Sequence, residues 1–244
     1  MNASILEIQN PATFAEKYML LRQKEQRIYT DEEVSRLPYI DSAHPHSKEW
    51  LLRKKSSDSL LEYLQKKNEN LNILEVGCGN GWLSGRLSKI TSREVIGTDI
   101  NLTELAQAKR VFGHISNLLF IYGDIQSQLK IQFDVIVFSA SIQYFHSIRE
   151  ILSSALDRLT HRGEIHIIDT AFYTEKNVDL AKKRSMDYYT SIGFPEMAEH
   201  YFHHCLTDLS SFNYTILYDP FSWRNKLSKQ QSPFYWIKVQ NHST

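Results

Sequence analysis

A glycine-rich bend lies within the segment Ile73-Leu74-Glu75-Val76-Gly77-Cys78-Gly79-Asn80-Gly81-Trp82. An apolar run of strand length leads directly into three alternate glycines, and a helical pattern begins at Trp82. Glycines at such a bend let the backbone turn sharply and approach a ligand closely, and the free N–H groups at the helix start favour electron-rich ligand atoms. The segment therefore predicts a strand, a ligand-binding loop and a helix.

Strand and helix patterns alternate along the chain around this segment. Strand-like runs are expected at residues 72–76, 94–98, 118–122, 133–138 and 164–169. Helices are expected between them, and both Asn101 with Glu104 and Ser147 with Glu150 have the spacing of a helix capping box. This alternation implies a sheet wound by right-handed crossovers, with helices on both faces. We therefore predict an α/β fold with a Rossmann-like, doubly wound, mostly parallel sheet.

The ends of the chain follow other patterns. We expect one domain, 1–244, with four parts: an N-terminal helical cap (1–68), the alternating core (69–170), a helical insertion after the fifth strand (171–212) and C-terminal antiparallel strands (213–244). The cap carries helical patterns from Thr13 to about Arg36 and from Ser47 to about Lys67. The runs 213–218 and 234–240 are too close for another crossover helix, which favours an antiparallel pair at the sheet edge.

Composition limits the classes of function. Lys plus Arg equals Asp plus Glu at 28 each, so no excess of positive charge favours a nucleic-acid partner. Two cysteines, Cys78 and Cys205, are too few for a disulfide framework, and we expect a cytoplasmic protein. We find no apolar run of membrane-spanning length and no signal-peptide pattern, so no membrane association is expected. The oligomeric state is left open.

Asp99 supports a nucleoside ligand for the glycine loop. It lies at the end of the second predicted strand, where an acid accepts the protons of ribose hydroxyls. The dinucleotide fingerprint requires a third glycine at its sixth place, where Trp82 stands. Glu75, just before the loop, can organise the loop N–H groups or face an ammonium group. A nucleoside without a pyrophosphate is therefore favoured, with a nucleotide-dependent oxidoreductase on a similar sheet as an alternative.

Several motifs in order resemble those of the class I S-adenosylmethionine-dependent methyltransferases. The resemblance rests on Leu74–Gly81, Gly97–Ile100 and Tyr122–Ile125, and it covers roughly Leu71 to Asp169. It implies an enzyme of the small-molecule type, which transfers a methyl group from S-adenosylmethionine to an O, N or C acceptor by in-line displacement. It also implies a seven-stranded sheet in which the last strand is antiparallel and lies beside the fifth.

The resemblance also implies which residues contact the cofactor. They are Glu75, Gly77, Gly79, Gly81, Asp99, Ile100, Asp124, Ile125 and Ser139. The glycines would line the methionine part, Asp99 would hold the ribose, and Asp124 with Ile125 would lie at the adenine. Arg53 lies in the helix before the first strand, where some members of the family place a cation for the cofactor carboxylate; packing of that helix is the alternative.

The acceptor side is expected near the ends of the fourth and fifth strands. Gln143 and Tyr144 follow the fourth strand, and Asp169 with Tyr173 lies at the end of the fifth. A general base is needed only if the acceptor loses a proton early, and His146 is the candidate for that role. His146 also directly precedes a predicted helix cap, so a structural role at the helix entry is the alternative. Aromatic residues in the insertion favour a planar or apolar acceptor, although core packing explains them equally well.

Two further possibilities concern metals and catalytic silence. His200, His203 and His204 have helical spacing near acidic residues, but the segment lacks a metal-site signature, so no metal is expected. A methyltransferase-like binding module without activity is also possible, since a scaffold can keep its cofactor residues after its acceptor pocket has closed.

Overall fold

A computed structural model describes residues 11–67, 69–125, 131–226 and 232–241 of the chain. Its strands are β1 (Ile73–Val76), β2 (Val95–Asp99), β3 (Leu118–Tyr122), β4 (Phe133–Ser139), β5 (Leu159–Thr170), β6 (Asn213–Tyr218) and β7 (Tyr235–Gln240). Its α-helices are α1 (Pro11–Lys24), α2 (Asp31–Arg36), α3 (Ser47–Lys66), α4 (Trp82–Leu87), α5 (Leu102–Phe112), α6 (Ile148–Leu156), α7 (Val178–Ser191) and α8 (Trp223–Lys226). The first ten residues of the predicted cap lie outside the described residues.

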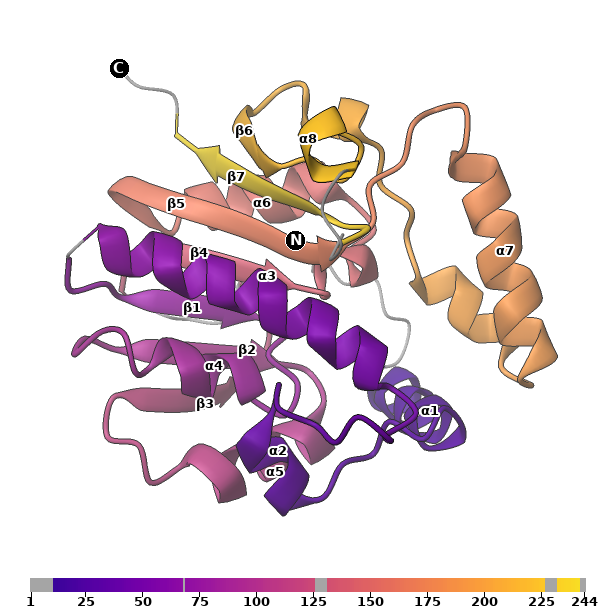
Figure 1. Cartoon of the computed structure of the whole chain (residues 1–244), viewed down its shortest axis with the longest axis horizontal. Helices are drawn as coiled ribbons and strands as arrows, with labels where there is room; N and C mark the ends of the chain where they lie inside the picture. Colours follow the sequence, from indigo (N-terminus) through magenta and orange to yellow (C-terminus); the bar gives the residue numbers. More distant parts are fainter. Residues whose placement is uncertain (1–10, 68, 126–130, 227–231, 242–244) are drawn as a thin grey trace.

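The strands form one seven-stranded sheet in the order β3-β2-β1-β4-β5-β7-β6. Strands β1 to β5 pair in parallel, and β7 runs antiparallel to both β5 and β6. Figure 1 shows the parallel arrowheads pointing toward the end of the sheet where α1 and α7 lie. The predicted Rossmann-like fold, with an antiparallel last strand beside the fifth, is confirmed.

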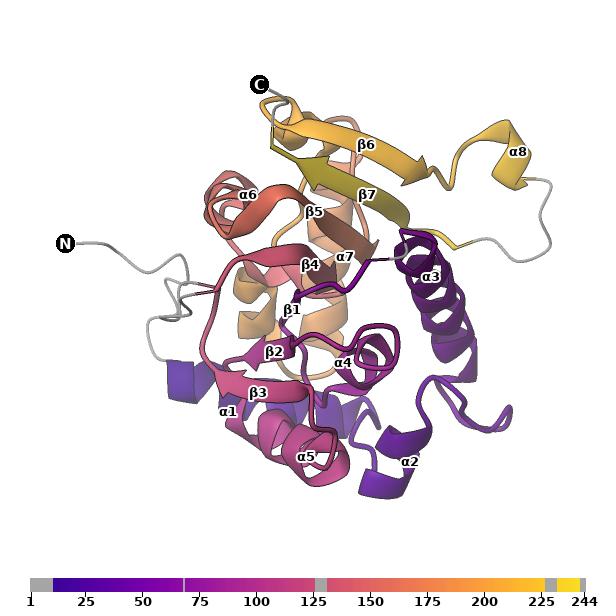
Figure 2. The ribbon, with the colours of Figure 1, turned by 90° about the vertical axis from the view of Figure 1, so that its left-hand side faces the viewer.

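Apolar clusters cover both faces of the sheet, which explains the nearly continuous apolar runs of its central strands. In β4, Ile136 and Phe138 belong to the cluster that includes α6, whereas Val135 and Val137 belong to the cluster that includes α3, α4 and α5. Figure 2 shows α3 and α4 on one side of the sheet and α6 on the other. The helices therefore hold the carboxyl ends of the strands in fixed positions.

The N-terminal helical pattern is divided where the sequence predicted continuous helical character. Helix α1 ends at Lys24, and Gln26 adopts a left-handed backbone conformation with φ 58°. Helix α2 then begins with a capping box, in which the Thr30 side chain accepts from the Glu33 backbone and the Glu33 side chain accepts from the Thr30 backbone. The chain therefore turns after α1, and α1 covers the end of the sheet as a separate helix (Figure 1).

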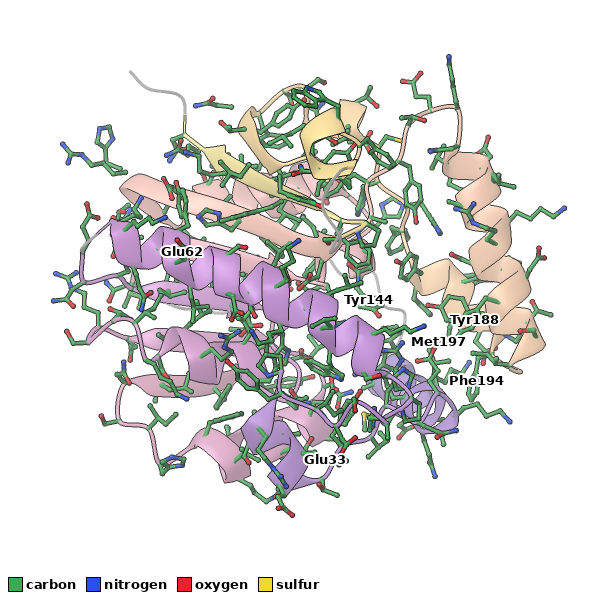
Figure 3. All side chains as sticks on the ribbon, viewed as in Figure 1. Glu33, Glu62, Tyr144, Tyr188, Phe194 and Met197 are labelled. Atoms are coloured by element: carbon green, nitrogen blue, oxygen red, sulfur yellow. The ribbon has the colours of Figure 1, made fainter. Side chains whose placement is uncertain are left out.

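A small third cluster joins α1 to the insertion. Phe14 and Leu21 of α1 are buried against Tyr189 of α7 and Met197 of a following 3₁₀ helix, Pro195–His200. Figure 3 shows Phe194, Met197 and Tyr144 toward the α7 end of the sheet. The N-terminal cap and the insertion thus meet over the carboxyl edge of the sheet.

Candidate functional site

A cavity of about 390 Å³ lies at the carboxyl edge of the sheet. We call one side the sheet wall: it consists of lining residues from the carboxyl ends of β1 to β5 and from the segments that directly follow these strands, up to the first turn of α5. We call the other side the cap wall: it consists of lining residues from α1 to Tyr29, from the first part of α3, and from the insertion at Tyr189 and Tyr201. The cavity therefore brings together segments that are far apart in the sequence.

The glycine loop forms the centre of the sheet wall. Gly77 and Gly79 line the cavity with φ angles of 75° and 52°, in the left-handed region that glycine tolerates best. A Cβ atom at Gly77 would lie 2.5 Å from the Cβ atom of Ser141. The loop backbone and the segment after β4 are thus packed too closely for a side chain at this position.

The third glycine of the loop has a different environment. Gly81 has a φ of 76°, but it is absent from the described lining of the cavity. A Cβ atom there would lie 2.6 Å from the Phe120 ring and 2.9 Å from Ala108. Gly81 therefore lets the start of α4 pack against β3 and α5, rather than approach a ligand as the sequence interpretation expected.

Asp99 holds the loop to the end of β2. Its carboxylate accepts hydrogen bonds from the backbone N–H of Gly79 at 2.7 Å and from that of Asn101 at 2.8 Å. Burial raises the pKa of Asp99, while its backbone hydrogen bonds oppose this change. Asp99 is therefore fixed in the cavity wall at the position that the sequence predicted.

Two further carboxyl groups line the cavity near Asp99. Glu75 at the end of β1 accepts a hydrogen bond from the Ser84 hydroxyl, and burial raises its pKa to about 8. Burial raises the pKa of Glu104 to about 7; the positive charge of Arg22 opposes this change and the negative charge of Asp99 adds to it. Because burial disfavours the ionised form of each group, the sheet wall favours a ligand that brings positive charge.

The residues expected at an adenine ring divide into two sets. Ile100 and Asp124 line the cavity and are half-buried. Ile125 has only 1% of its surface exposed and packs in the apolar cluster that includes α6, away from the cavity lining. The structure thus brings Ile100 and Asp124 to the cavity but not Ile125.

The ends of β4 and β5 meet at the far part of the sheet wall. Asp169 accepts hydrogen bonds from the hydroxyl of Ser56 at 2.6 Å and from that of Ser139 at 3.3 Å. Asp169 has a φ of 55°, an uncommon conformation for a residue with a side chain. Gln143 donates its amide to the Ala140 carbonyl at 2.6 Å and accepts from Thr170 at 3.0 Å. Asp169, Ser139 and Gln143 all line the cavity, so the structure brings the ends of β4 and β5 together there.

Two arginines of the cap wall are neutralised within the protein. Arg27 pairs with Glu49 at 2.7 Å and with Glu25 at 3.2 Å. Arg53 donates to Glu49 at 3.0 Å and lies 5.4 Å from the centroid of the Trp50 ring. Arg53 lines the cavity where the sequence placed a candidate cation, but its charge already has a carboxylate partner.

Aromatic rings gather where the cap wall meets the segment after β4. The ring of Tyr144 lies in edge contact with Tyr18 at 6.0 Å and with Tyr201 at 6.1 Å, measured between centroids. Burial raises the pKa of Tyr18 and of Tyr144, so their hydroxyl groups remain protonated donors at neutral pH. This side of the cavity fits an apolar or planar group.

Two predicted acceptor-side residues are not brought to the cavity. His146 is exposed, and its ring contacts Phe202 at 5.1 Å between centroids. Tyr173 is half-buried and lies against His203, with its backbone paired to that of Cys205. Neither residue is among those that line the cavity. His146, the candidate general base, therefore lies on the outer surface, because the turn after β4 directs this residue away from the cavity.

The sequence interpretation missed Arg22 and assigned Glu104 to another role. Glu104 has the spacing of a capping box with Asn101, and Asn101 does accept from the Glu104 backbone at 3.2 Å. The N–H of Asn101, however, donates to Asp99, which leaves the Glu104 carboxyl group to line the cavity. Arg22 could have been noticed as a cation beside Phe14, Tyr18 and Leu21 on the buried side of an amphipathic helix.

Two other kinds of site are absent from the described part of the chain. No group of three or more His, Cys, Asp or Glu side chains there is arranged to hold a metal ion. His200, His203 and His204 instead have separate partners, namely the Phe14 ring, the Ser185 hydroxyl and the Ile142 carbonyl. Within the same residues, no helix is both long and apolar enough to span a membrane.

Among curated proteins, the chain is similar to the malonyl-[acyl-carrier protein] O-methyltransferase of Bacillus anthracis. The two are 28% identical over 117 residues, which is 46% of this chain and 43% of that protein. The match therefore spans less than half the length of this relative.

Two solved structures share the fold over nearly the whole chain. One is the magnesium protoporphyrin IX methyltransferase of Synechocystis PCC 6803 with bound S-adenosylhomocysteine: it is 14% identical, has a TM-score of 0.62, and the match covers 95% of this chain and 100% of that one. The other is the plantazolicin methyltransferase BpumL: it is 17% identical, has a TM-score of 0.54, and the match covers 95% of this chain and 98% of that one. At these identities the likeness shows the fold.

Family membership rests on a broader match. The family described as "Methyltransferase domain" matches residues 67–231, which is more than half of the chain and includes the glycine loop, Asp99 and Asp124. The chain therefore belongs to the methyltransferase family, and the resemblance to class I S-adenosylmethionine-dependent methyltransferases inferred from its motifs is confirmed.

Proposed function

We propose that the protein transfers a methyl group from S-adenosylmethionine to a small-molecule acceptor. The observation that carries this proposal is that three carboxyl groups line the cavity beside the glycine loop, Glu75, Asp99 and Glu104, and that desolvation raises the pKa of each. S-adenosylmethionine brings two positive charges, on its sulfonium and its ammonium group, against one carboxylate, and these positive charges stabilise the three groups in their ionised form. The pyrophosphate of a dinucleotide brings only negative charge. The alternative of a nucleotide-dependent oxidoreductase is correspondingly disfavoured.

The described contacts support a role for each sheet-wall residue. Gly77 and Gly79 line the cavity and are proposed to lie along the methionine part, and Asp99 is fixed where it can accept the ribose hydroxyl protons. Ile100 and Asp124 are proposed to lie at the adenine. The packing of Gly81 and Ile125 supports structural roles for these two residues instead.

Methyl transfer requires little acid–base catalysis by the protein. When bound, the cofactor supplies a methyl carbon attached to a positively charged sulfur, which leaves as a neutral thioether. The protein aligns the acceptor behind that carbon and excludes water. Ser139 and Tyr144 are proposed to lie beside the reacting atoms. Asp169 is the buried carboxyl group at the acceptor end that can receive a proton, a role for which the exposed His146 is poorly placed.

Isothermal titration of the purified chain with S-adenosylmethionine, S-adenosylhomocysteine and NAD tests the proposal. We expect the two sulfur nucleosides to bind and NAD not to bind. Asp99→Asn should weaken S-adenosylhomocysteine binding roughly 10- to 100-fold, because it removes a charged hydrogen-bond acceptor. The matched control is Asp31→Asn, which removes the exposed partner of Arg110 and should leave binding unchanged.

Activity requires a second measurement. Release of S-adenosylhomocysteine in the presence of phenols, amines and carboxylates would establish transfer. Preferential binding of NAD would contradict the proposal, and binding of S-adenosylmethionine without transfer to any tested acceptor would favour a silent binding module. Two free cysteines in the described residues agree with a reducing compartment, so we also propose a cytoplasmic location.

A further inference from the structure

Arg22 is an unusual cation in the cap wall. Its guanidinium lies 5.7 Å from the centroid of the Tyr18 ring; the residue is half-buried, and its Nε atom is shielded from solvent. In the described residues, two buried side-chain polar atoms lack a hydrogen-bond partner, namely Arg22 Nε and Asn101 Nδ2, and both residues line the cavity. A buried donor without a partner is costly, so an orphaned donor beside a cavity points to a ligand that satisfies it.

The other cap-wall arginines show what Arg22 lacks. Arg27 has two carboxylate partners and Arg53 has one. Glu104 affects the pKa of Arg22, yet no carboxylate among the described side chains lies within ion-pair distance of the Arg22 guanidinium. Among the described arginines of the cap wall, Arg22 therefore has a positive charge that no carboxylate of the protein neutralises, and this charge is available to a ligand.

The surroundings of Arg22 indicate what kind of anion fits. Tyr18 and Tyr144 lie close enough to Arg22 to raise its pKa, and their rings form part of the aromatic surface that includes Tyr201. Aromatic faces suit a planar or apolar body, while the guanidinium and the phenol hydroxyls donate hydrogen bonds to oxygen. A guanidinium can donate two parallel hydrogen bonds to the two oxygens of a carboxylate, whereas it repels an ammonium group.

We propose that Arg22 binds a carboxylate group of the methyl acceptor, which makes the acceptor an aromatic or apolar carboxylic acid. This inference rests on the proposed function, because it assumes that the sheet wall holds the cofactor. The cofactor also has a carboxylate, so the test must distinguish the two sources of this chemistry.

The test uses the protein loaded with S-adenosylhomocysteine and titrated with matched acids and amides. The probes are 1-naphthoate with 1-naphthamide, indole-3-acetate with indole-3-acetamide, and 4-hydroxybenzoate with its amide. We expect the wild-type complex to bind at least one acid roughly tenfold more tightly than its amide. Arg22→Met should abolish this preference and Arg22→Lys should keep part of it. Arg36→Met, a matched change at an exposed arginine, should keep all of it.

The affinity of Arg22→Met for S-adenosylhomocysteine shows whether Arg22 binds the carboxylate of the acceptor or that of the cofactor. We expect it to change less than about threefold in Arg22→Met, since the acceptor carboxylate is the proposed partner. A parallel loss of S-adenosylhomocysteine binding would assign Arg22 to the cofactor and overturn the inference. Equal binding of acid and amide in every pair would overturn it too, with the proposed function intact. A wild-type protein that binds no S-adenosylhomocysteine would end both.

Stability of the unliganded variant provides an independent check. Removing a buried charge that lacks a partner should leave the melting temperature of Arg22→Met unchanged or raise it. A marked fall in the melting temperature would show that the guanidinium stabilises the fold, and would contradict a role reserved for a ligand.

Discussion

The sheet wall and the cap wall of the cavity are built in different ways. Backbone geometry sets the sheet wall: Gly77 has a left-handed conformation, and Asp99 is held by two N–H groups. Side chains set the cap wall, through a small apolar cluster and an exposed ion pair between Lys17 and Glu196, of a kind that contributes little stability. The difference suggests that the cofactor part of the site is rigid, while acceptor choice depends on replaceable side chains.

Gly77→Ala is expected to produce the largest effect on the sheet wall. The new Cβ atom would lie 2.5 Å from that of Ser141, and the residue would keep an unfavourable φ. Strain and overpacking together should lower the free energy of unfolding by about 3 kcal/mol and abolish S-adenosylhomocysteine binding. Urea denaturation and titration calorimetry measure these two changes.

Gly193→Ala is the matched control for this substitution. Gly193 has a φ of 89°, but a Cβ atom added there would have no neighbour within 4 Å. The substitution should therefore cost only about 1 kcal/mol, from the backbone conformation alone. Equal losses in the two variants would mean that the close packing of the loop is unimportant, and would remove the distinction between the walls.

Met197→Ala tests the cap wall. Met197 is 2% exposed in the small cluster that joins α1 to the insertion. The substitution should lower the free energy of unfolding by about 2 kcal/mol, because a small cluster can partly close the space left behind. The affinity for S-adenosylhomocysteine should change less than about threefold, since distant sites act independently.

Met186→Ala is the comparison for Met197→Ala, because Met186 is 44% exposed on α7. It should change stability by less than about 0.5 kcal/mol. A Met197→Ala protein that no longer binds S-adenosylhomocysteine would show that the two walls cannot be separated.

The smallest expected effect is the pH dependence of stability that arises from Glu104, a sheet-wall residue whose pKa is influenced by Arg22 of the cap wall. Burial raises the pKa of Glu104 from 4.5 to about 7. Its contribution to stability is therefore complete below about pH 4.5 and is lost as the pH rises through about 7. Between pH 6 and 9, the unliganded wild type should lose about 1 kcal/mol more than Glu104→Gln.

Thermal or urea unfolding across this pH range measures the difference. Glu62→Gln is the control, since Glu62 is exposed on α3, at the opposite end of the sheet from α7 (Figure 3). Equal pH slopes in wild type and Glu104→Gln would show that the Glu104 carboxyl group is not strained by burial.

The sequence predicted the sheet wall better than the cap wall because its signals are local. Alternating apolar strands and helices predict a mostly parallel, doubly wound sheet, and glycines at Gly77 and Gly79 indicate a backbone conformation directly. Asp99 follows from its place at a strand end. These features depend on neighbours in the chain, which a pattern can show.

The errors concern the direction of side chains, which depends on contacts between distant segments. Ile125 follows Asp124 in the chain, yet it packs in the core. Glu104 has the spacing of a capping-box residue, but the Asn101 N–H, which would donate to a capping glutamate, donates to Asp99 instead. The break after α1 occurs at Gln26 without a glycine or proline to mark it. Arg22 can be assigned to the site only from the folded structure, in which α1 lies over the cavity.

The position of β7 has a consequence for how the chain is made. This strand is the last in sequence, yet it lies in the interior of the sheet and pairs with β5 on one side and β6 on the other. During synthesis on the ribosome, the outer edge of β5 can gain its native partner only after Tyr235–Gln240 has emerged. Until then both β5 and β6 present open edges, which is the period when a nascent chain is most exposed to wrong pairing and to chaperone binding.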